Sequence, residues 1–237
     1  MEPDDELTDV FVGGYWWSRG ETPEQIGARL HRWLGDLAGL HDDFGSWTVM
    51  DRPAGDVEML TALIRRGFNP DEETGQPLED LGFRVFGDTT PTGAPRADFS
   101  LKAGATASSV PNNVLLRSPY RKPFPREWIG LAVPLIESVV HCWQPDVAVL
   151  ARSTYMRAMN SVSRGQYRAP GALTWLPVDP DQVPQVVEAQ TVTPLAGGAL
   201  ISLMDGQAMP EVETVLELTR GLMATGLLDV NPGNDQR

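Results

Sequence analysis

The 237-residue sequence predicts an α+β fold, in which amphipathic helices pack on a mainly antiparallel sheet. Strand-like and helix-like segments alternate at first, and a block of strand-like segments fills the middle of the chain. No linker is long enough to separate two domains, and 41% hydrophobic residues suffice for a core. We therefore expect a single domain over residues 9–229, with flexible ends at 1–8 and 230–237.

The first predicted strand covers residues 9–17, DVFVGGYWW, because β-branched and aromatic residues dominate it. Its two glycines indicate a bulge or a close backbone approach. A helix follows, since Thr22 can cap it, Pro23 suits the first helical position and Gln25 occupies the capping-box position. Its buried face is predicted from five side chains at helical spacing: Ile26, Leu30, Trp33, Leu34 and Leu37.

A second short strand is predicted at residues 46–50, followed by a second helix that Asp56 caps and that ends near Arg66. Val57 is expected on the inward face of this helix, together with the later leucines and isoleucine. Residues 69–80, NPDEETGQPLED, are polar and rich in Pro and Gly, which is typical of a loop.

The middle of the chain is predicted to be β-rich. Three strand-like runs are separated by turn-forming residues: 81–89, 97–105 and 112–119. Phe99, Leu101 and Ala103 alternate with Ser100 and Lys102, so one face of these strands is expected to be buried and the other solvated.

The last part of the chain begins with a long apolar helix over residues 126–143, which Pro134 should kink or split. Several further segments follow: a buried strand at 147–151, a short helix and an irregular basic segment within 153–171, strands at 172–178, 186–192 and 198–204, and a final helix after Pro210. Gly197-Gly198 is the predicted turn between the last two strands.

The formal charge of −13 argues against direct binding of nucleic acid. The charge is uneven, because residues 1–80 hold 18 acids and 6 bases, whereas residues 81–178 hold 5 acids and 11 bases. Two interpretations of the acidic segments remain open. They form solvated helix faces and loops, or they form a docking face for a basic protein.

A cytoplasmic location is the default expectation. Cys142 is the only cysteine in the sequence, so no intrachain disulfide can form and a reducing compartment fits. The first residues, MEPDDELTD, are acidic where a signal peptide would be basic and then apolar. No apolar run reaches the roughly 18 residues that a membrane span needs, so no membrane partner is expected.

Familiar catalytic signatures are absent from the sequence, including the nucleophile elbow, the zinc-protease motif and the glycine-rich phosphate loops. His31, His41 and His141 lack zinc-ligand spacing, and Cys142 is interpreted as an inert buried thiol. We therefore expect no catalytic residue, metal or cofactor. Two alternatives remain: a hydrolase that uses Asp51 or Asp88, and a general interaction module.

The motif order resembles a known family. The motifs are Tyr15-Trp16-Trp17-Ser18-Arg19-Gly20-Glu21, Ala28-Arg29-Leu30 with Leu37, Asp43-Phe44 with Trp47, Leu81-Gly82-Phe83, Lys102-Ala103-Gly104, Asn112-Asn113-Val114, Trp143-x-Pro145-Asp146 and Gly198-Ala199-Leu200-Ile201. This order resembles the immunity protein 52 family of bacterial polymorphic toxin systems, from about residue 10 to residue 228. The family's opening is closer to Tyr-Trp-Gly-x-Arg-x-Glu, and Trp17 replaces its small residue here.

The resemblance implies that the chain binds and neutralises a cognate toxin, expected to be a basic nuclease with a restriction-endonuclease-like fold. An acidic inhibitor would be steered onto such a partner. The predicted contributors are seven acids: Asp42, Asp43, Asp71, Glu72, Glu73, Glu79 and Asp80. Trp16 or Trp17 is the predicted aromatic anchor, because neighbours in a strand face opposite ways. Tyr15, Arg19 and Glu21 are predicted to be structural, with Arg19 and Glu21 fixing the turn. The oligomeric state is left open.

Overall fold

The computed structural model describes residues 7–89, 96–119, 122–163 and 169–229, except for the side chains of residues 161–163. The strands in these residues are β1 Val10–Trp16, β2 Trp47–Val49, β3 Arg52–Pro53, β4 Phe83–Thr89, β5 Asp98–Ala103, β6 Asn112–Arg117, β7 Val147–Arg152, β8 Leu173–Leu176, β9 Thr191–Leu195 and β10 Gly198–Ser202. They form one sheet in the order β3-β2-β4-β5-β6-β1-β7-β8-β10-β9. All its strand pairings are antiparallel.

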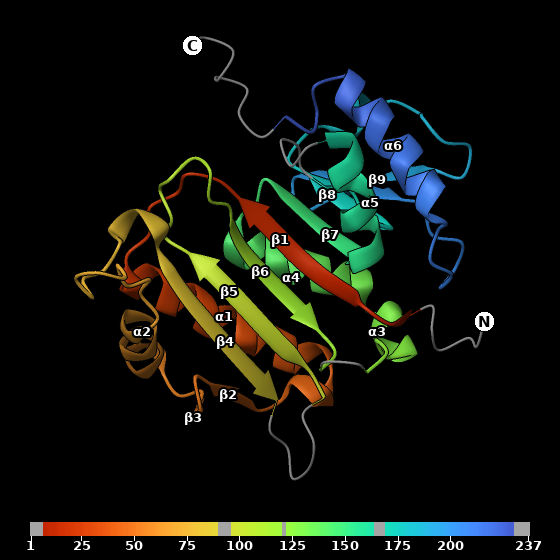
Figure 1. The fold of residues 1–237 in the computed structure, drawn as a ribbon. Coiled ribbons are helices and arrows are strands. Elements are labelled where there is room, and N and C mark those ends of the chain that lie inside the picture. Colours follow the sequence, from red (N-terminus) through yellow and green to blue (C-terminus); the bar gives the residue numbers. More distant parts are fainter. Residues whose placement is uncertain (1–6, 90–95, 120–121, 164–168, 230–237) are drawn as a thin grey trace.

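Helices lie on both faces of this sheet (Figure 1). The helices are α1 Pro23–Leu40, α2 Val57–Arg66, α3 Arg126–Ile129, α4 Ala132–Trp143, α5 Ser153–Ser163 and α6 Val212–Ala224. Helices α1 and α4 pack together behind the sheet, and α4 contacts β1 and β7. Helices α5 and α6 pack together on the opposite face, where α5 contacts β7. On that second face, no described helix covers β4, β5 or β6. The predicted α+β class is confirmed.

The structure describes only part of the two predicted chain ends. Of the two expected flexible ends, residues 1–6 and 230–237 lie outside the described residues. Leu7 is buried, and its carbonyl oxygen accepts a hydrogen bond from the backbone N–H of Phe124. Among the described helices, none combines the length and the apolar character that a membrane crossing requires.

The first two helices begin where the sequence predicts. Thr22 and Gln25 form the expected capping box of α1, and Asp56 caps α2 through the backbone N–H of Met59. The inward orientation predicted for Val57 is wrong, because this side chain is 37% exposed. Val57 is the first residue of α2, and the buried stripe of this helix begins only at Leu60, one turn later.

The predicted helix over residues 126–143 is split, as its proline suggests, although not at the proline. Helix α3 ends at Ile129 and α4 begins at Ala132, so Gly130 and Leu131 separate the two. Pro134 lies in the first turn of α4, where a backbone N–H would have no partner within the helix.

The strand predicted at residues 186–192 is wrong over most of its length, since β9 begins only at Thr191. The Gln190 side chain holds the preceding residues in a turn: its Oε1 accepts from the Val186 N–H, and its Nε2 donates to the Pro184 carbonyl. The following turn lies at Ala196-Gly197, which both have positive φ, one residue before the predicted Gly197-Gly198 turn.

The central strands show the predicted alternation. Phe99, Leu101 and Ala103 are buried, whereas Ser100 and Lys102 on the other face are only partly buried. On β1, Gly14 explains how closely α4 approaches the sheet, because a Cβ placed there would lie 2.6 Å from Val139 Cγ1. The backbone of β1 and the side chains of α4 are therefore in direct contact.

Candidate functional site

The opening motif, residues 15–21, contains two adjacent tryptophans with different environments. Trp16 is 2% exposed, and its ring stacks on that of Trp143 with centroids 5.6 Å apart. Trp16 therefore belongs to the core, and the prediction that it could be the exposed aromatic anchor is wrong. Trp17 packs against the core but keeps partial exposure, so it is the member of the pair that retains accessible surface.

Arg19 joins this motif to the carboxyl end of α4. Its Nη2 donates a 2.6 Å hydrogen bond to the Trp143 carbonyl, and its Nη1 donates a 3.1 Å hydrogen bond to the Gln144 carbonyl. Its guanidinium carbon lies 4.9 Å from the centre of the Trp16 ring. A cation at a helix carboxyl end is favourable, because the last carbonyls lack partners within the helix. Burial lowers the pKa of Arg19, while Glu21 opposes this effect.

Glu21 completes this arrangement between two arginines. Its side chain is 4% exposed, with Oε1 2.9 Å from Arg29 Nε and Oε2 3.4 Å from Arg19 Nε. Arg29 in turn donates a 2.7 Å hydrogen bond to the Cys142 carbonyl. We call Arg19, Glu21 and Arg29 the α4 clamp. It connects the turn after β1 and helix α1 to the last turn of α4.

The end of β1 is fixed by a second set of contacts. The backbone N–H of Asp146 donates to the Tyr15 carbonyl, and the Trp17 N–H donates to Asp146 Oδ2 at 3.1 Å. The Tyr15 side chain packs against the core, and its burial raises the pKa to about 12. No sequence pattern identifies Arg29 and Asp146 as structural partners. Their only signal was membership in the ordered motifs that carry the family resemblance.

Five of the seven predicted acids lie in one loop, residues 69–82, which we call the acidic loop. Asp71 organises it, because its Oδ1 accepts hydrogen bonds from the backbone N–H groups of Glu73 and Thr74 and from the Thr74 hydroxyl. These hydrogen bonds, chiefly those from Thr74, lower the pKa of Asp71. The Asp71 carboxylate thus shapes the loop, whereas Glu72 and Glu73 project into solvent.

The acidic loop borders a pocket of about 800 Å³ beside the amino end of α1. Phe68, Leu78 and Phe83 supply apolar wall, and Glu79 and Asp80 supply carboxylates. Phe68 is 36% exposed, and no local sequence pattern indicates that it lies beside these acids. The Asp80 carbonyl anchors the loop by accepting hydrogen bonds from the N–H groups of Thr106 and Ala107. Arg65 also lines the pocket, where it pairs with Glu24 outside the acidic loop. The apolar wall and the carboxylates of Glu79 and Asp80 suit a cationic side chain with an aliphatic stem.

The other two predicted acids lie elsewhere. Asp42 and Asp43 precede β2, whose Trp47 pairs with Thr89 at the far end of β4 from the acidic loop. The two groups lie toward opposite ends of β4, a strand of seven residues that is about 20 Å long. Asp43 is also engaged internally, because its Oδ1 lies 3.1 Å from Arg96 Nη1. The seven acids therefore form two groups rather than one continuous patch.

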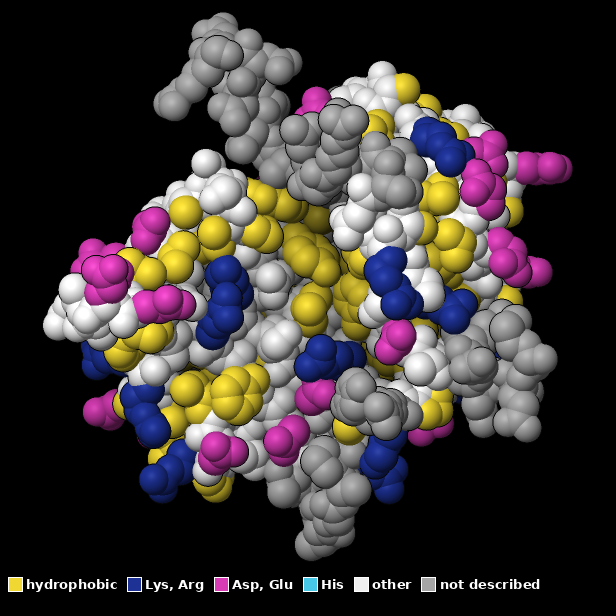
Figure 2. Space-filling view, in the orientation of Figure 1, with side chains coloured by type: hydrophobic (Ala, Val, Ile, Leu, Met, Phe, Trp, Pro, Cys, Tyr) yellow, Lys and Arg dark blue, Asp and Glu magenta, His cyan; other side chains and the backbone are white. Residues whose placement is uncertain are grey.

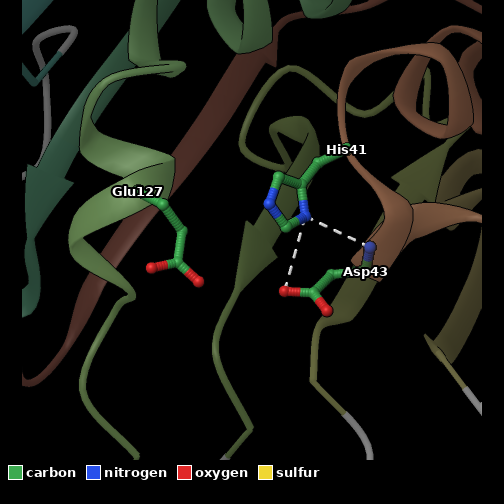
Figure 3. Close-up of side chains that lie close together, drawn as sticks. All are labelled: His41, Asp43 and Glu127. Atoms are coloured by element: carbon green, nitrogen blue, oxygen red, sulfur yellow. Dashed lines mark hydrogen bonds and ion pairs between the residues drawn. The ribbon is translucent and has the colours of Figure 1, made fainter.

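His41, Asp43 and Glu127 bring three possible metal ligands within 4.8 Å of one another (Figure 3). His41 Nδ1 accepts a 3.2 Å hydrogen bond from the Asp43 backbone N–H and lies 3.5 Å from Asp43 Oδ2. The other ring nitrogen of His41 faces Glu127 in Figure 3. The Asp43 carboxylate also forms an ion pair with Arg96, so contacts within the protein account for its position in this cluster.

The acids of the alternative hydrolase interpretation lie on separate elements. Asp51 follows β2 at a positive φ of 63°, and its side chain is exposed. Asp88 lies on β4 directly opposite Asp98 of β5. Burial raises the pKa of Asp98, and the hydrogen-bonded Arg117 guanidinium opposes that shift.

Comparisons with known proteins give a fold relationship. No family model matches the sequence, and no curated protein matches it. The structure is similar to that of Pseudomonas aeruginosa T6SS protein PA0821, with a TM-score of 0.51 and 8% sequence identity. The similarity covers 91% of this chain and 72% of that chain. At this identity, the likeness shows a shared fold alone.

Proposed function

We propose that the chain is a cytoplasmic immunity protein that binds a cognate bacterial toxin in a stoichiometric complex and thereby neutralises it. The order of motifs that resembles the immunity protein 52 family supports this proposal. The structural neighbour is named as a T6SS protein, which is compatible with a place in a toxin system. The resemblance further suggests a nuclease of restriction-endonuclease-like fold as the toxin.

The observation that carries the proposal is the acidic loop beside an apolar-walled pocket. Its carboxylates at Glu72, Glu73, Glu79 and Asp80 are exposed, and internal hydrogen bonds that Asp71 accepts hold the loop in shape. A preformed loop loses little conformational entropy when a partner docks on it. The exposed acids would steer a basic surface toward the pocket, where Phe68 offers apolar contact.

Inhibition then follows from occupation of the toxin surface, without turnover by this chain. A lysine or arginine of the toxin would place its aliphatic stem against Phe68 and Leu78 and its charge beside Glu79 and Asp80. If those cations belong to the groove that holds the toxin's nucleic acid, the complex excludes the substrate. If they lie elsewhere on the toxin, the complex blocks its assembly or rearrangement instead.

The direct test is co-expression with the product of the neighbouring gene. We expect cell survival and co-purification of the two proteins in equal amounts. The double variant Glu79→Gln with Asp80→Asn should weaken protection, because it removes the carboxylates of the pocket. Glu211→Gln with Glu217→Gln is the matched control, since these exposed acids lie at or on α6, away from the acidic loop. Toxicity that persists with the unaltered chain, with no complex recovered, would refute the proposal.

A further inference from the structure

A second candidate surface lies on the part of the sheet that helices leave uncovered. Register places Phe86, Ser100, Leu115 and Gly13 in one row across β4, β5, β6 and β1. Phe86 is 55% exposed, and Gly13 makes room for Leu115, because a Cβ on Gly13 would lie 2.6 Å from Leu115 Cδ2. The row therefore presents the apolar side chains of Phe86 and Leu115 on the solvent-exposed side of the sheet.

This face is hollowed where it meets helix α5. A groove of about 450 Å³ has a floor that includes Phe11, Tyr15 and Leu115 from the sheet, with Met156 from α5. Figure 2 shows hydrophobic side chains in a hollow of this face, with Lys and Arg side chains on either side of it. The groove is thus apolar at its base and cationic at its borders.

Three cations border the groove from three different segments. Arg117 projects from β6, Arg157 from α5 and Lys122 from the segment before α3. Arg117 forms an ion pair with Asp98. Within the described part of the chain, no carboxylate lies within ion-pair distance of Lys122 or Arg157, and Asp9 is the acid among the lining residues.

Two further cations lie next to this groove on the same open face. Arg84 and Lys102 are directly opposite each other on β4 and β5, and their row continues through Asn113 to Tyr15. Burial, with a contribution from the Arg84 charge, lowers the pKa of Lys102. Like charges held together in this way favour an anionic group placed above them.

We propose that this basic groove binds an amphipathic segment of a partner protein, in which an apolar stripe is bordered by acidic side chains. The apolar base accepts the stripe, and cations on both borders pair with the acids, in the manner of a helix laid in a groove. The overall charge of −13 disfavours a nucleic acid as the occupant, because a long polyanion would meet the field of the whole chain. The surface is separate from the acidic loop and does not depend on the toxin assignment.

Fluorescence anisotropy tests this proposal with defined probes. The main probe is a labelled peptide of about twelve residues, whose leucines form a helical stripe bordered by glutamates. A second peptide replaces each glutamate with lysine, and a thymidine oligonucleotide of similar length represents nucleic acid. We expect binding of the glutamate peptide alone. The double variant Lys122→Glu with Arg157→Glu should weaken it at least about tenfold.

Two further measurements keep the outcome decisive. The control Arg52→Glu with Arg66→Glu changes two exposed arginines outside the groove and should leave the affinity unchanged. Thermal unfolding will confirm that both double variants are folded, which is expected because all four side chains are exposed. Failure of the glutamate peptide to bind, equal binding by both double variants, or tighter binding of the oligonucleotide would each overturn the proposal. None of these results would alter the co-expression test of the toxin assignment.

Discussion

The guanidinium of Arg19 donates a 2.6 Å hydrogen bond to the carbonyl oxygen of Trp143, a residue 124 positions later in the chain. The contact joins the turn after β1 to the last residue of α4. Trp16 also stacks on the Trp143 ring, so the last residue of α4 contacts both Trp16 and Arg19 of the opening motif. The opening motif, which is one of the motifs in the family resemblance, therefore has a structural role.

Loss of the Arg19 side chain should destabilise the fold. Arg19→Ala removes two hydrogen bonds to α4 and one of the two cations beside the buried Glu21 carboxylate. We expect a loss of about 2 kcal/mol in the free energy of unfolding, because hydrogen bonds from charged groups contribute more than neutral ones. Urea denaturation measures this. Arg65→Ala is the control, since its pair with Glu24 is exposed and should matter little. Equal effects of the two changes would contradict the clamp.

Gly14 and Gly35 should respond to alanine in opposite directions. A Cβ on Gly14 would lie 2.6 Å from Val139 Cγ1 and 3.3 Å from Pro145 Cβ, so Gly14→Ala should cost about 1–3 kcal/mol. Gly35 is exposed within α1 and a Cβ there meets no atom within 4 Å, so Gly35→Ala should stabilise by up to about 1 kcal/mol. Thermal unfolding of the two variants checks both signs. A stabilising Gly14→Ala would show that α4 does not pack directly on β1.

Alkaline pH should lower stability partly through Tyr15. Burial raises the pKa of Tyr15 from 10.0 to about 12, so between these values the unfolded chain loses a proton that the folded chain keeps. The stability contribution is complete below pH 10.0 and is lost as the pH rises through about 12. Cys142, whose pKa burial raises from 9.0 to about 12, acts in the same direction. Tyr15→Phe should therefore show a shallower decline of unfolding free energy over this window, and an unchanged slope would contradict the assignment.

The local elements were largely predictable, because their signals are carried by neighbouring residues. The capping box at Thr22 and Gln25 fixed the start of α1, and alternation at Phe99 and Leu101 fixed the buried face of β5. The strand order depends on pairings between distant segments, which periodicity does not encode. The exposure of Trp16 and Trp17 was likewise open, because alternation shows that they differ but not which one faces the core.

The candidate site was predictable in composition but not in arrangement. The polar, turn-rich sequence of residues 69–80 indicated an acidic loop. Nothing local showed that Phe68 and Phe83 would form an apolar wall beside Glu79, or that Asp43 would be engaged by Arg96 at the far end of β4. Those placements depend on how β4 pairs with β2 and β5, which is a property of the whole sheet.

The most direct test of the account is the salt dependence of association between the purified chain and the product of the neighbouring toxin gene. Stopped-flow association should slow by at least about tenfold from low to high salt, because exposed acids of the acidic loop steer the encounter. A variant with Glu72, Glu73, Glu79 and Asp80 changed to their amides should associate slowly at low salt and lose most of this dependence. An association rate that is the same at low and high salt, or that this variant leaves unchanged, would contradict the central claim.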